Sequence, residues 1–171
     1  MKKATTHILA AATFAALFAT LPAAAHAHGG GEHRSPAKTE ISDEEYAFGR
    51  QGDPKKATRT IAIDMSDKMR FSPAEITVRQ GDTIRFVVRN KGKMLHEMVI
   101  GTMDELNAHA EMMRKHPGME HADPYMSHVG AGKKQELVWQ FTKAGDFYFA
   151  CLIPGHFEAG MVGKIKVTKG L

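Results

Sequence analysis

The chain contains one cysteine, Cys151, and its spacing from two later residues limits the fold more than any other feature. His156 follows five positions after it and Met161 ten positions after it. A thiolate, an imidazole and a thioether form a donor set that suits copper, with the thioether as a weak axial ligand. A trigonal site needs a second imidazole, and His96, just before an apolar run, is the best candidate. The expected metal ligands are therefore His96, Cys151, His156 and Met161.

The sequence around the cysteine predicts that three of these donors lie on one loop between two strands. Residues 146–151 are aromatic and apolar, which is typical of a buried strand that ends at the cysteine. Pro154-Gly155 predicts a turn, and residues 162–168 alternate as a final strand. A loop anchored by two strands can hold its side chains in fixed directions, which suits a metal that changes its charge.

The same loop and several upstream stretches resemble the cupredoxin family of type 1 (blue) copper proteins. In the loop, the resemblance lies in residues 149–156 and 160–165. Upstream it lies in stretches similar to the early strands of that family, namely Phe71-Ser72-Pro73, Ile76-Thr77-Val78, Gly81-Asp82-Thr83-Ile84 and Phe86-Val87-Val88-Arg89-Asn90. The resemblance covers residues 58 to 169, and the mature chain is most similar to the small periplasmic copper-tolerance cupredoxins of the CopI type.

The resemblance implies one type 1 copper site in which His96 is the first ligand. Cys151 would form the short, covalent bond, and His96 and His156 would be equatorial. Met161 would be the long axial donor that tunes the redox potential. Glu97 departs from the family pattern, in which Asn or Ser often follows the first histidine and ties the two ligand loops together.

Strand signals recur from residue 58 onward. Besides the two strands beside the loop, runs that alternate with period two or are rich in β-branched and aromatic residues occur at 60–65, 75–78, 83–88, 95–101 and 137–141. About seven short strands at this spacing predict an all-β fold, an antiparallel Greek-key β-sandwich. We expect this cupredoxin domain to span residues 58–171, with Trp139, the only tryptophan, in its core.

One segment, residues 102–128, breaks the strand pattern and is predicted to be a His- and Met-rich helical insertion. Residues 104–115 have helix-forming composition. Thr102 is a candidate N-cap, and Pro117-Gly118 is expected to end the helix.

Histidine and methionine together occur ten times between residues 98 and 128, and four of them share one helix face at positions i, i+3, i+4 and i+7. Imidazole and thioether donors suit Cu(I), so this segment is a candidate for additional copper binding. The alternative is that Met112 and Met113 pack the helix onto the sandwich, since methionine at helical spacing usually belongs to a core. The candidate additional ligands are His109, Met112, Met113, His116, Met119 and His121.

Residues 1–27 have the features of a secretory signal peptide. Lys2 and Lys3 form the basic start, residues 8–21 the apolar stretch, and Ala25-His26-Ala27 an A-x-A cleavage site. The apolar stretch is too short to span a bilayer comfortably. The prediction is export to the periplasm, with cleavage after Ala27 or after Ala25.

Residues 28–57 are predicted to form a flexible N-terminal arm, because they are polar and show no sustained period. Tyr46 and Phe48 are its expected packing anchors. After cleavage, the amino group and imidazole of His28 could join the imidazole of His33 in a surface Cu(II) or Zn(II) site. The alternative is a disordered Gly-rich arm that binds no metal.

Charge and cysteine content exclude several classes of function. The formal net charge of +4 falls to +2 once Lys2 and Lys3 are removed, and the basic residues are scattered, so we expect no nucleic-acid-binding face. A lone cysteine cannot form an internal disulfide, and a free exposed thiol outside the cytoplasm would oxidise. We expect a monomer that binds copper ions, has no membrane association after cleavage and meets a periplasmic redox protein.

The predicted function is copper tolerance, through copper binding and cycling of its redox state in the periplasm. One-electron transfer between periplasmic partners is the alternative, which the copper loop alone favours, whereas the His- and Met-rich segment favours copper handling. An enzyme is not expected. Multicopper oxidases place a histidine on each side of the cysteine, whereas Ala150 and Leu152 flank it here, and nucleophilic Cys–His catalysis would give Met161 no role.

Overall fold

The computed structural model describes residues 41–119 and 121–170. The predicted signal peptide, His28 and His33 lie outside the described residues. Within those two ranges, no helix has the length and apolar character needed to cross a membrane.

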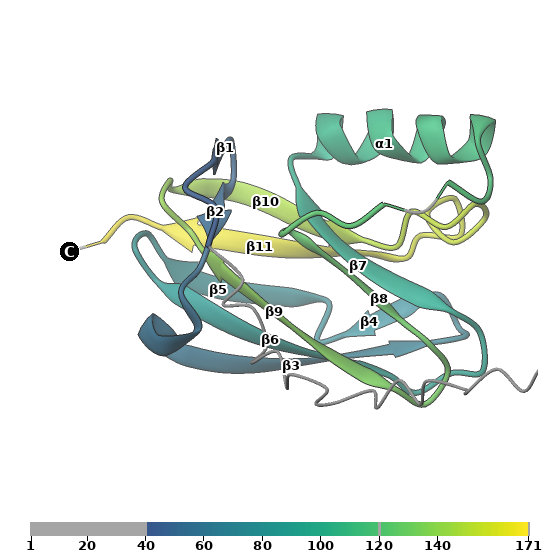
Figure 1. The fold of residues 1–171 in the computed structure, drawn as a ribbon, viewed down its shortest axis with the longest axis horizontal. Helices are drawn as coiled ribbons and strands as arrows, with labels where there is room; N and C mark the ends of the chain where they lie inside the picture. The colour runs from purple at the N-terminus through teal and green to yellow at the C-terminus, as the bar shows by residue number, and fades with distance from the viewer. Residues whose placement is uncertain (1–40, 120, 171) are drawn as a thin grey trace, which may run out of the picture. The chain divides into compact units, whose positions relative to one another are not determined.

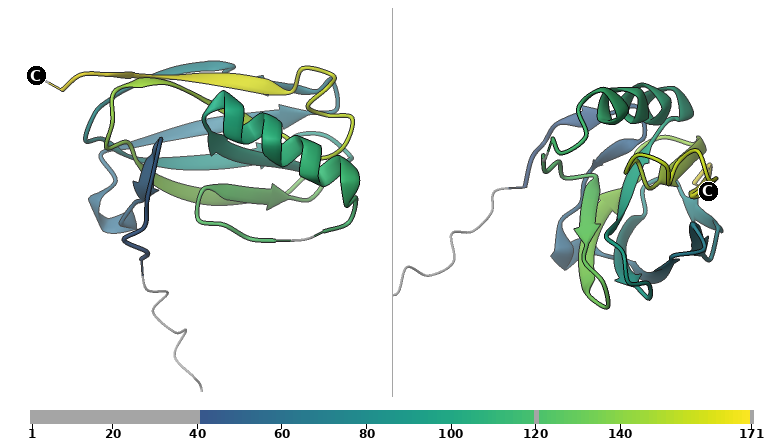
Figure 2. Two further views of the ribbon diagram at one scale, coloured as in Figure 1. Left: turned by 90° about the horizontal axis from the view of Figure 1, so that it is seen from above. Right: turned by 90° about the vertical axis from the view of Figure 1, so that its right-hand side faces the viewer.

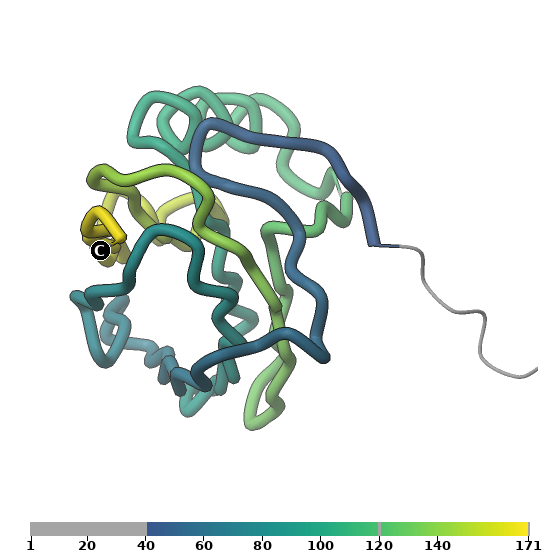
Figure 3. Tube along the Cα trace, turned by 90° about the vertical axis from the view of Figure 1, so that its left-hand side faces the viewer, coloured from purple at the N-terminus to yellow at the C-terminus, as the bar shows by residue number. Residues whose placement is uncertain are grey.

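Two β-sheets form the body of the domain (Figure 1). Among the described residues, the first sheet has the strand order β1-β2-β9-β6-β3-β4 and the second has the order β5-β11-β10-β7-β8. The first sheet consists of β1 (Glu45–Tyr46), β2 (Gly49–Gln51), β9 (Lys134–Gln140), β6 (Thr83–Asn90), β3 (Arg59–Ser66) and β4 (Arg70–Ser72). The second consists of β5 (Glu75–Arg79), β11 (Val162–Thr168), β10 (Gly145–Ala150), β7 (His96–Gly101) and β8 (Met126–Val129). Figure 3 views the domain end-on and shows the strands on the two sides of a common interior.

Alternation along the strands builds the core between the sheets. In β6 the side chains of Ile84, Phe86 and Val88 are fully buried, and the residues between them are only partly covered. Trp139 of β9 is also fully buried, so its predicted place in the core is confirmed. Burial of each such side chain contributes about 1.5–3 kcal/mol, and the sandwich is therefore a firm scaffold for the loops at its ends.

The sandwich is confirmed, but two of its strand pairs are parallel. β3 pairs with β6, and β5 pairs with β11, in parallel registers. Neighbouring parallel strands need a crossover connection, and local strand patterns in a sequence do not reveal which strands such a connection joins. Both sheets are therefore mixed rather than purely antiparallel.

The predicted helix is confirmed as α1 (Met103–Lys115), with a short 3-10 turn, η1 (Pro54–Lys56), elsewhere in the chain. Thr102 caps α1: its hydroxyl accepts from the Glu105 N–H at 3.3 Å, and the Glu105 carboxylate accepts from the Thr102 N–H at 2.9 Å. The helix lies across the outer face of the second sheet (Figure 2). The predicted insertion ends earlier than residue 128, because Met126–Val129 forms β8 and pairs with β7.

Part of the predicted flexible arm belongs to the first sheet, so the prediction of flexibility is wrong for residues 45–51. Residues 45–51 contain β1 and β2, and β2 pairs with β9. The prediction that Tyr46 and Phe48 anchor this segment is confirmed, because both rings pack against Trp139 and the Phe48 carbonyl accepts a hydrogen bond from Trp139 Nε1 at 3.0 Å. Strands this short show no period in the sequence, and pairing with β9 determines them instead.

Candidate metal centre

β7 and β10 bring His96 and Cys151 to the same end of the core. β7 is buried along its whole length: Met98 faces the core between the sheets, and Val99 faces α1. The two-residue period of a strand places His96 on the same face as Met98. Cys151 also belongs to the core between the sheets, and the pairing of Ala150 with Val99 sets it beside the start of β7.

The loop after Cys151 returns the chain to it at Met161. The Cys151 N–H donates to the Met161 carbonyl at 3.1 Å, and the Met161 N–H donates to the His156 carbonyl at 3.0 Å. Gly155 and Gly160 have φ values of 89° and 84°, which residues with a Cβ rarely adopt. These glycines let the chain turn sharply, so that the fully buried Met161 lies directly across the backbone from the cysteine.

Three of the four predicted ligands converge on one point. One ligand atom each from His96, Cys151 and His156 lies within 4.8 Å of the other two, and within the described residues no other group of three or more His, Cys, Asp or Glu side chains does so. Cys151 Sγ is 3.2 Å from His156 Nδ1, and the two imidazole centroids are 4.9 Å apart. This cluster and the adjacent Met161 are the donor set that type 1 copper prefers.

His96 has one ring nitrogen free for a metal and the other held by a carboxylate. Its Nδ1 is buried and has no hydrogen-bond partner, which is costly unless a ligand satisfies it. Its Nε2 is 3.0 Å from Asp67 Oδ1 in the turn between β3 and β4. The N–H groups of Lys93 and Met94, together with His96, hold the pKa of Asp67 below its usual value. An ionised Asp67 favours the tautomer with the proton on Nε2, which leaves Nδ1 able to bind a metal.

Glu97 links the two segments that carry the predicted ligands. In the cupredoxin pattern, Asn or Ser often makes this link. The Glu97 carboxylate accepts from the Leu152 N–H at 2.7 Å, and the Glu97 N–H donates to Cys151 Sγ at 3.4 Å. The other carboxylate oxygen lies 2.9 Å from His128 Nε2. Burial raises the pKa of Glu97, and the Leu152 N–H and His128 oppose this shift. The longer side chain therefore preserves the link and extends it to β8.

The protein environment favours the neutral thiol of Cys151. Burial raises the pKa of Cys151 to about 12, although the N–H groups of Glu97 and Ile153 favour the thiolate. Burial, followed by the neighbouring His96, lowers the pKa of His156 below its ordinary value. A cation that binds here therefore displaces a proton from the sulfur, as metal sites that use thiolate ligands do.

The structure divides the six candidate additional ligands into separate groups. Met113 packs with Leu106 and Ala110 in the apolar layer beneath α1, so the packing alternative holds for it. His116 is exposed at the C-cap of α1. His109, Met112 and His121 line one cavity. The exposed Met119 lines a different groove, which also includes Met113, His121, His128 and His156.

Sequence reasoning missed two carboxylates that face histidines. Asp67 lies 29 residues before His96, in a turn with no metal-binding pattern. Asp123 lies two residues after His121, with its Oδ2 3.8 Å from His121 Nε2. The short His-x-Asp spacing was a usable signal for Asp123, whereas only the pairing of β3 with β4 and β6 brings Asp67 to His96.

Comparisons with known proteins agree with this geometry. The family model for copper binding proteins of the plastocyanin/azurin family matches residues 57–168. The copper-resistant cuproprotein CopI of Rubrivivax gelatinosus is 56% identical over 154 residues, which cover 90% of this chain and 92% of the relative. The protein of the same name from Pseudomonas aeruginosa is 37% identical over 150 residues, which cover 71% of this chain and 82% of the relative.

Solved structures show the same fold. Reduced auracyanin from Roseiflexus castenholzii has a TM-score of 0.57 and 25% identity, over 66% of this chain and 98% of that one. Auracyanin B has a TM-score of 0.59 and 17% identity, over 72% of this chain and 96% of that one. The family match spans more than half of the chain, and the relatives and the fold agree with it. The chain therefore belongs to the plastocyanin/azurin family of copper-binding proteins, the cupredoxins.

Proposed function

We propose that this chain is an exported cupredoxin that contributes to copper tolerance, and that His96, Cys151, His156 and Met161 hold its copper. One observation carries the ligand assignment. The buried, unpartnered Nδ1 of His96 lies in the same cluster as the thiol and the second imidazole. Without a ligand, this arrangement would bury an unsatisfied polar atom at a cost of about 1–3 kcal/mol.

The proposed site suits one-electron exchange. Copper in such a donor set takes up and releases a single electron. Asp67 holds the His96 ring, and the Glu97 N–H holds the sulfur of Cys151. Because these contacts fix the ligands before the metal arrives, little rearrangement accompanies a change in its charge.

The role in tolerance rests on the relatives and on the predicted signal peptide. Two proteins that cover most of this chain carry the name copper-resistant cuproprotein. Residues 1–27 predict export to the periplasm. In that compartment a protein can bind copper, and change its redox state, before the ion reaches the cytoplasm.

Electron transfer between periplasmic proteins is a second candidate. The half-buried ring of His156 lines the groove that also contains Met94, Ile153 and Pro154. An apolar surface beside a copper ligand gives a redox partner a place to dock near the metal. Catalysis of the multicopper-oxidase kind is not proposed, because Ala150 and Leu152 occupy the positions beside the cysteine where those enzymes have histidines.

A growth assay tests the tolerance role. The full chain would be produced in a bacterium that lacks its own exported copper-tolerance proteins, and growth would be measured at rising copper concentration. We expect the native chain to restore growth, and we expect Cys151→Ser and a variant without residues 1–27 to fail. Equal protection by Cys151→Ser would contradict the role of the site, and protection without residues 1–27 would contradict the proposed compartment.

A second assay separates tolerance from electron transfer. Oxidised purified protein would be mixed with reduced periplasmic cytochrome c, and the rate of electron exchange would be measured. Tolerance as the main role predicts that a variant with slow exchange but unchanged copper binding still protects cells. Loss of protection in step with the exchange rate would favour the carrier.

A further inference from the structure

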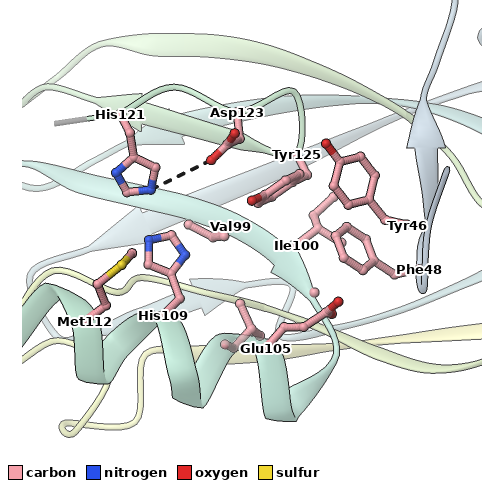
Figure 4. Close-up of a pocket in the computed structure, with 12 residues that line it drawn as sticks. Tyr46, Phe48, Val99, Ile100, Glu105, His109, Met112, His121, Asp123 and Tyr125 are labelled. Atoms are coloured by element: carbon pink, nitrogen blue, oxygen red, sulfur yellow. Dashed lines mark ion pairs between the residues drawn. The ribbon is translucent and has the colours of Figure 1, made fainter. Parts of the chain in front are cut away.

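A second group of metal-binding side chains lies outside the proposed type 1 site, between α1 and the segment that leads into β8. A cavity of about 390 Å³ is present there, and its lining includes His109, Met112, His121 and Asp123. Figure 4 shows the His121 ring directly above the His109 ring, with Met112 beside His109 on the same turn of α1. Two imidazoles and a thioether therefore meet at one cavity, although they come from separate segments of the chain.

The spacing of this histidine pair matches that of the proposed type 1 ligands. The ring centroids of His109 and His121 are 4.7 Å apart, with 41° between the ring planes. The corresponding values for His96 and His156 are 4.9 Å and 49°. The part of the chain that the structure describes thus contains two pairs of imidazoles at nearly the same separation, one of them beside a cysteine and the other beside a methionine.

His121 resembles His96 in the surroundings of its two ring nitrogens. Its Nδ1 is buried and has no hydrogen-bond partner, and its Nε2 faces a carboxylate, Asp123 Oδ2, at 3.8 Å. In His96, Nδ1 is likewise buried without a partner, and Nε2 lies 3.0 Å from Asp67 Oδ1. A carboxylate beside Nε2 favours the tautomer with the proton on that nitrogen, which leaves the unpartnered Nδ1 available to a metal.

Packing alone does not explain the side chains at this cavity. Leu106, Ala110 and Met113 already provide the buried face of α1. Met112 is 39% exposed and takes no part in that apolar layer. His109 is half-buried at the cavity, and burial, followed by its neighbour His121, lowers the pKa of its imidazole, which favours the neutral form that metals bind.

We propose that His109 and His121 bind a second copper ion, as Cu(I), with the thioether of Met112 as a third donor and Asp123 as the residue that orients His121. Imidazole and thioether donors with no thiolate favour Cu(I). This site does not include Cys151, so it can be tested separately from the proposed type 1 site. Its occupation would give the chain a second place to hold copper during copper stress.

The number of Cu(I) ions bound per chain tests the proposal. The purified mature protein would be titrated with Cu(I) without oxygen, in competition with a chromophoric chelator, and the bound copper would be counted by elemental analysis. We expect the double variant His109→Ala/His121→Ala to bind one copper fewer than the native chain. Because the two chains differ only at these positions, copper bound elsewhere cancels in the comparison.

His116→Ala is the matched control, since His116 is an exposed histidine at the end of the same helix. It should bind as much copper as the native chain. The visible band of the Cu(II)-loaded double variant should remain, because that band depends on Cys151, and its persistence would also show that the variant is folded. Cys151→Ser should show the opposite result, with no band and with the copper at His109 and His121 retained.

Two single variants resolve the roles of the other side chains. Asp123→Ala should weaken Cu(I) binding at this site by about 10–100-fold, as loss of a carboxylate that orients a ligand does. Met112→Leu should weaken Cu(I) binding while leaving the fold intact, because leucine has a similar volume and no sulfur. An unchanged copper count in the folded double variant, or an equal loss in His116→Ala, would overturn the proposal.

Discussion

Glu97 joins the two segments that carry the predicted copper ligands. Its carboxylate occupies a position at which the cupredoxin pattern often has the shorter Asn or Ser. It is 2% exposed, and it is tied to the Leu152 N–H on one side and to His128 on the other. Such a contact cannot be predicted from the residue type alone. Whether a carboxylate at this position reaches across depends on the register between β7 and β10.

Replacement of Glu97 tests this tie. Glu97→Ala leaves the buried Leu152 N–H without a partner, which should lower the free energy of unfolding by about 1–3 kcal/mol. Glu97→Gln keeps a carbonyl oxygen and should lose less. Chemical unfolding of the copper-free protein measures both changes. Equal stability of the alanine and glutamine variants would show that the hydrogen bond to Leu152 contributes nothing.

Asp67 is expected to govern the copper affinity of His96. Asp67→Ala removes the carboxylate from His96 Nε2 and should weaken Cu(II) binding by about 10–100-fold. Asp64→Ala is a suitable control. Asp64 lies on the same hairpin, but its carboxylate pairs with Arg89 rather than with His96. Competition with a chelator of known affinity measures the effect. Equal affinities in the two variants would contradict the orienting role.

The raised pKa of Cys151 predicts that copper binding depends on pH. The thiol is protonated well above neutrality because its pKa is about 12, and the pKa of His156 is lowered, so Cu(II) that binds the sulfur between pH 7 and pH 9 displaces a proton from it. Apparent Cu(II) affinity should therefore rise about tenfold for each unit of pH in this range. An affinity that is flat between pH 7 and pH 9, measured by competition, would mean that the sulfur is not a ligand.

At the level of elements, the ligand loop is held to the opposite sheet by Arg70 of β4. Its guanidinium Nη1 donates to the carbonyls of Ala159 at 2.9 Å and Gly160 at 3.4 Å, just before Met161. Gly92, in the turn after β6, lets the backbone approach Asp67 closely, because a Cβ at this position would lie only 1.9 Å from Asp67 Oδ1. Contacts from other elements therefore hold both the loop that carries Met161 and the turn that carries Gly92.

Arg70→Ala should loosen the end of the loop that carries Met161, the predicted axial donor. We expect a shift in the visible spectrum of the copper-loaded protein and a loss of about 1 kcal/mol in the free energy of unfolding, because the site is exposed. Arg59→Ala removes a similar bond, from Arg59 Nη1 to the Thr77 carbonyl, and should leave the spectrum unchanged. An identical spectrum in Arg70→Ala would show that β4 does not restrain Met161.

The elements that sequence could predict are those with a local signal. The helix is one, since its N-cap Thr102 and its partner Glu105 are neighbours in the chain. The Cys–His–Met loop is another, because its donors are close in sequence and both flanking strands have strong patterns. β1 and β2 escaped prediction because a strand of two or three residues has no period. The sequence could not single out His109 and His121 among the candidate additional ligands, because their contact depends on where the chain returns after α1.

At the scale of the whole molecule, β7 connects the two groups of donors, one facing the core between the sheets and the other beside α1 on the outer face of the second sheet. β7 supplies His96 at its start and leads to α1 at its end, and α1 carries His109 and Met112. His121 lines both the cavity beside α1 and the groove that reaches His156. The cavity and the groove therefore adjoin each other at His121.

The optical spectrum of the copper-loaded protein tests the central claim most directly. We predict that the purified mature chain, loaded with Cu(II), shows an intense visible absorption from thiolate-to-copper charge transfer. Cys151→Ser, loaded in the same way, should be colourless. An equally intense band in Cys151→Ser, or a colourless native protein that nevertheless binds Cu(II), would contradict a copper centre built on Cys151, His96, His156 and Met161.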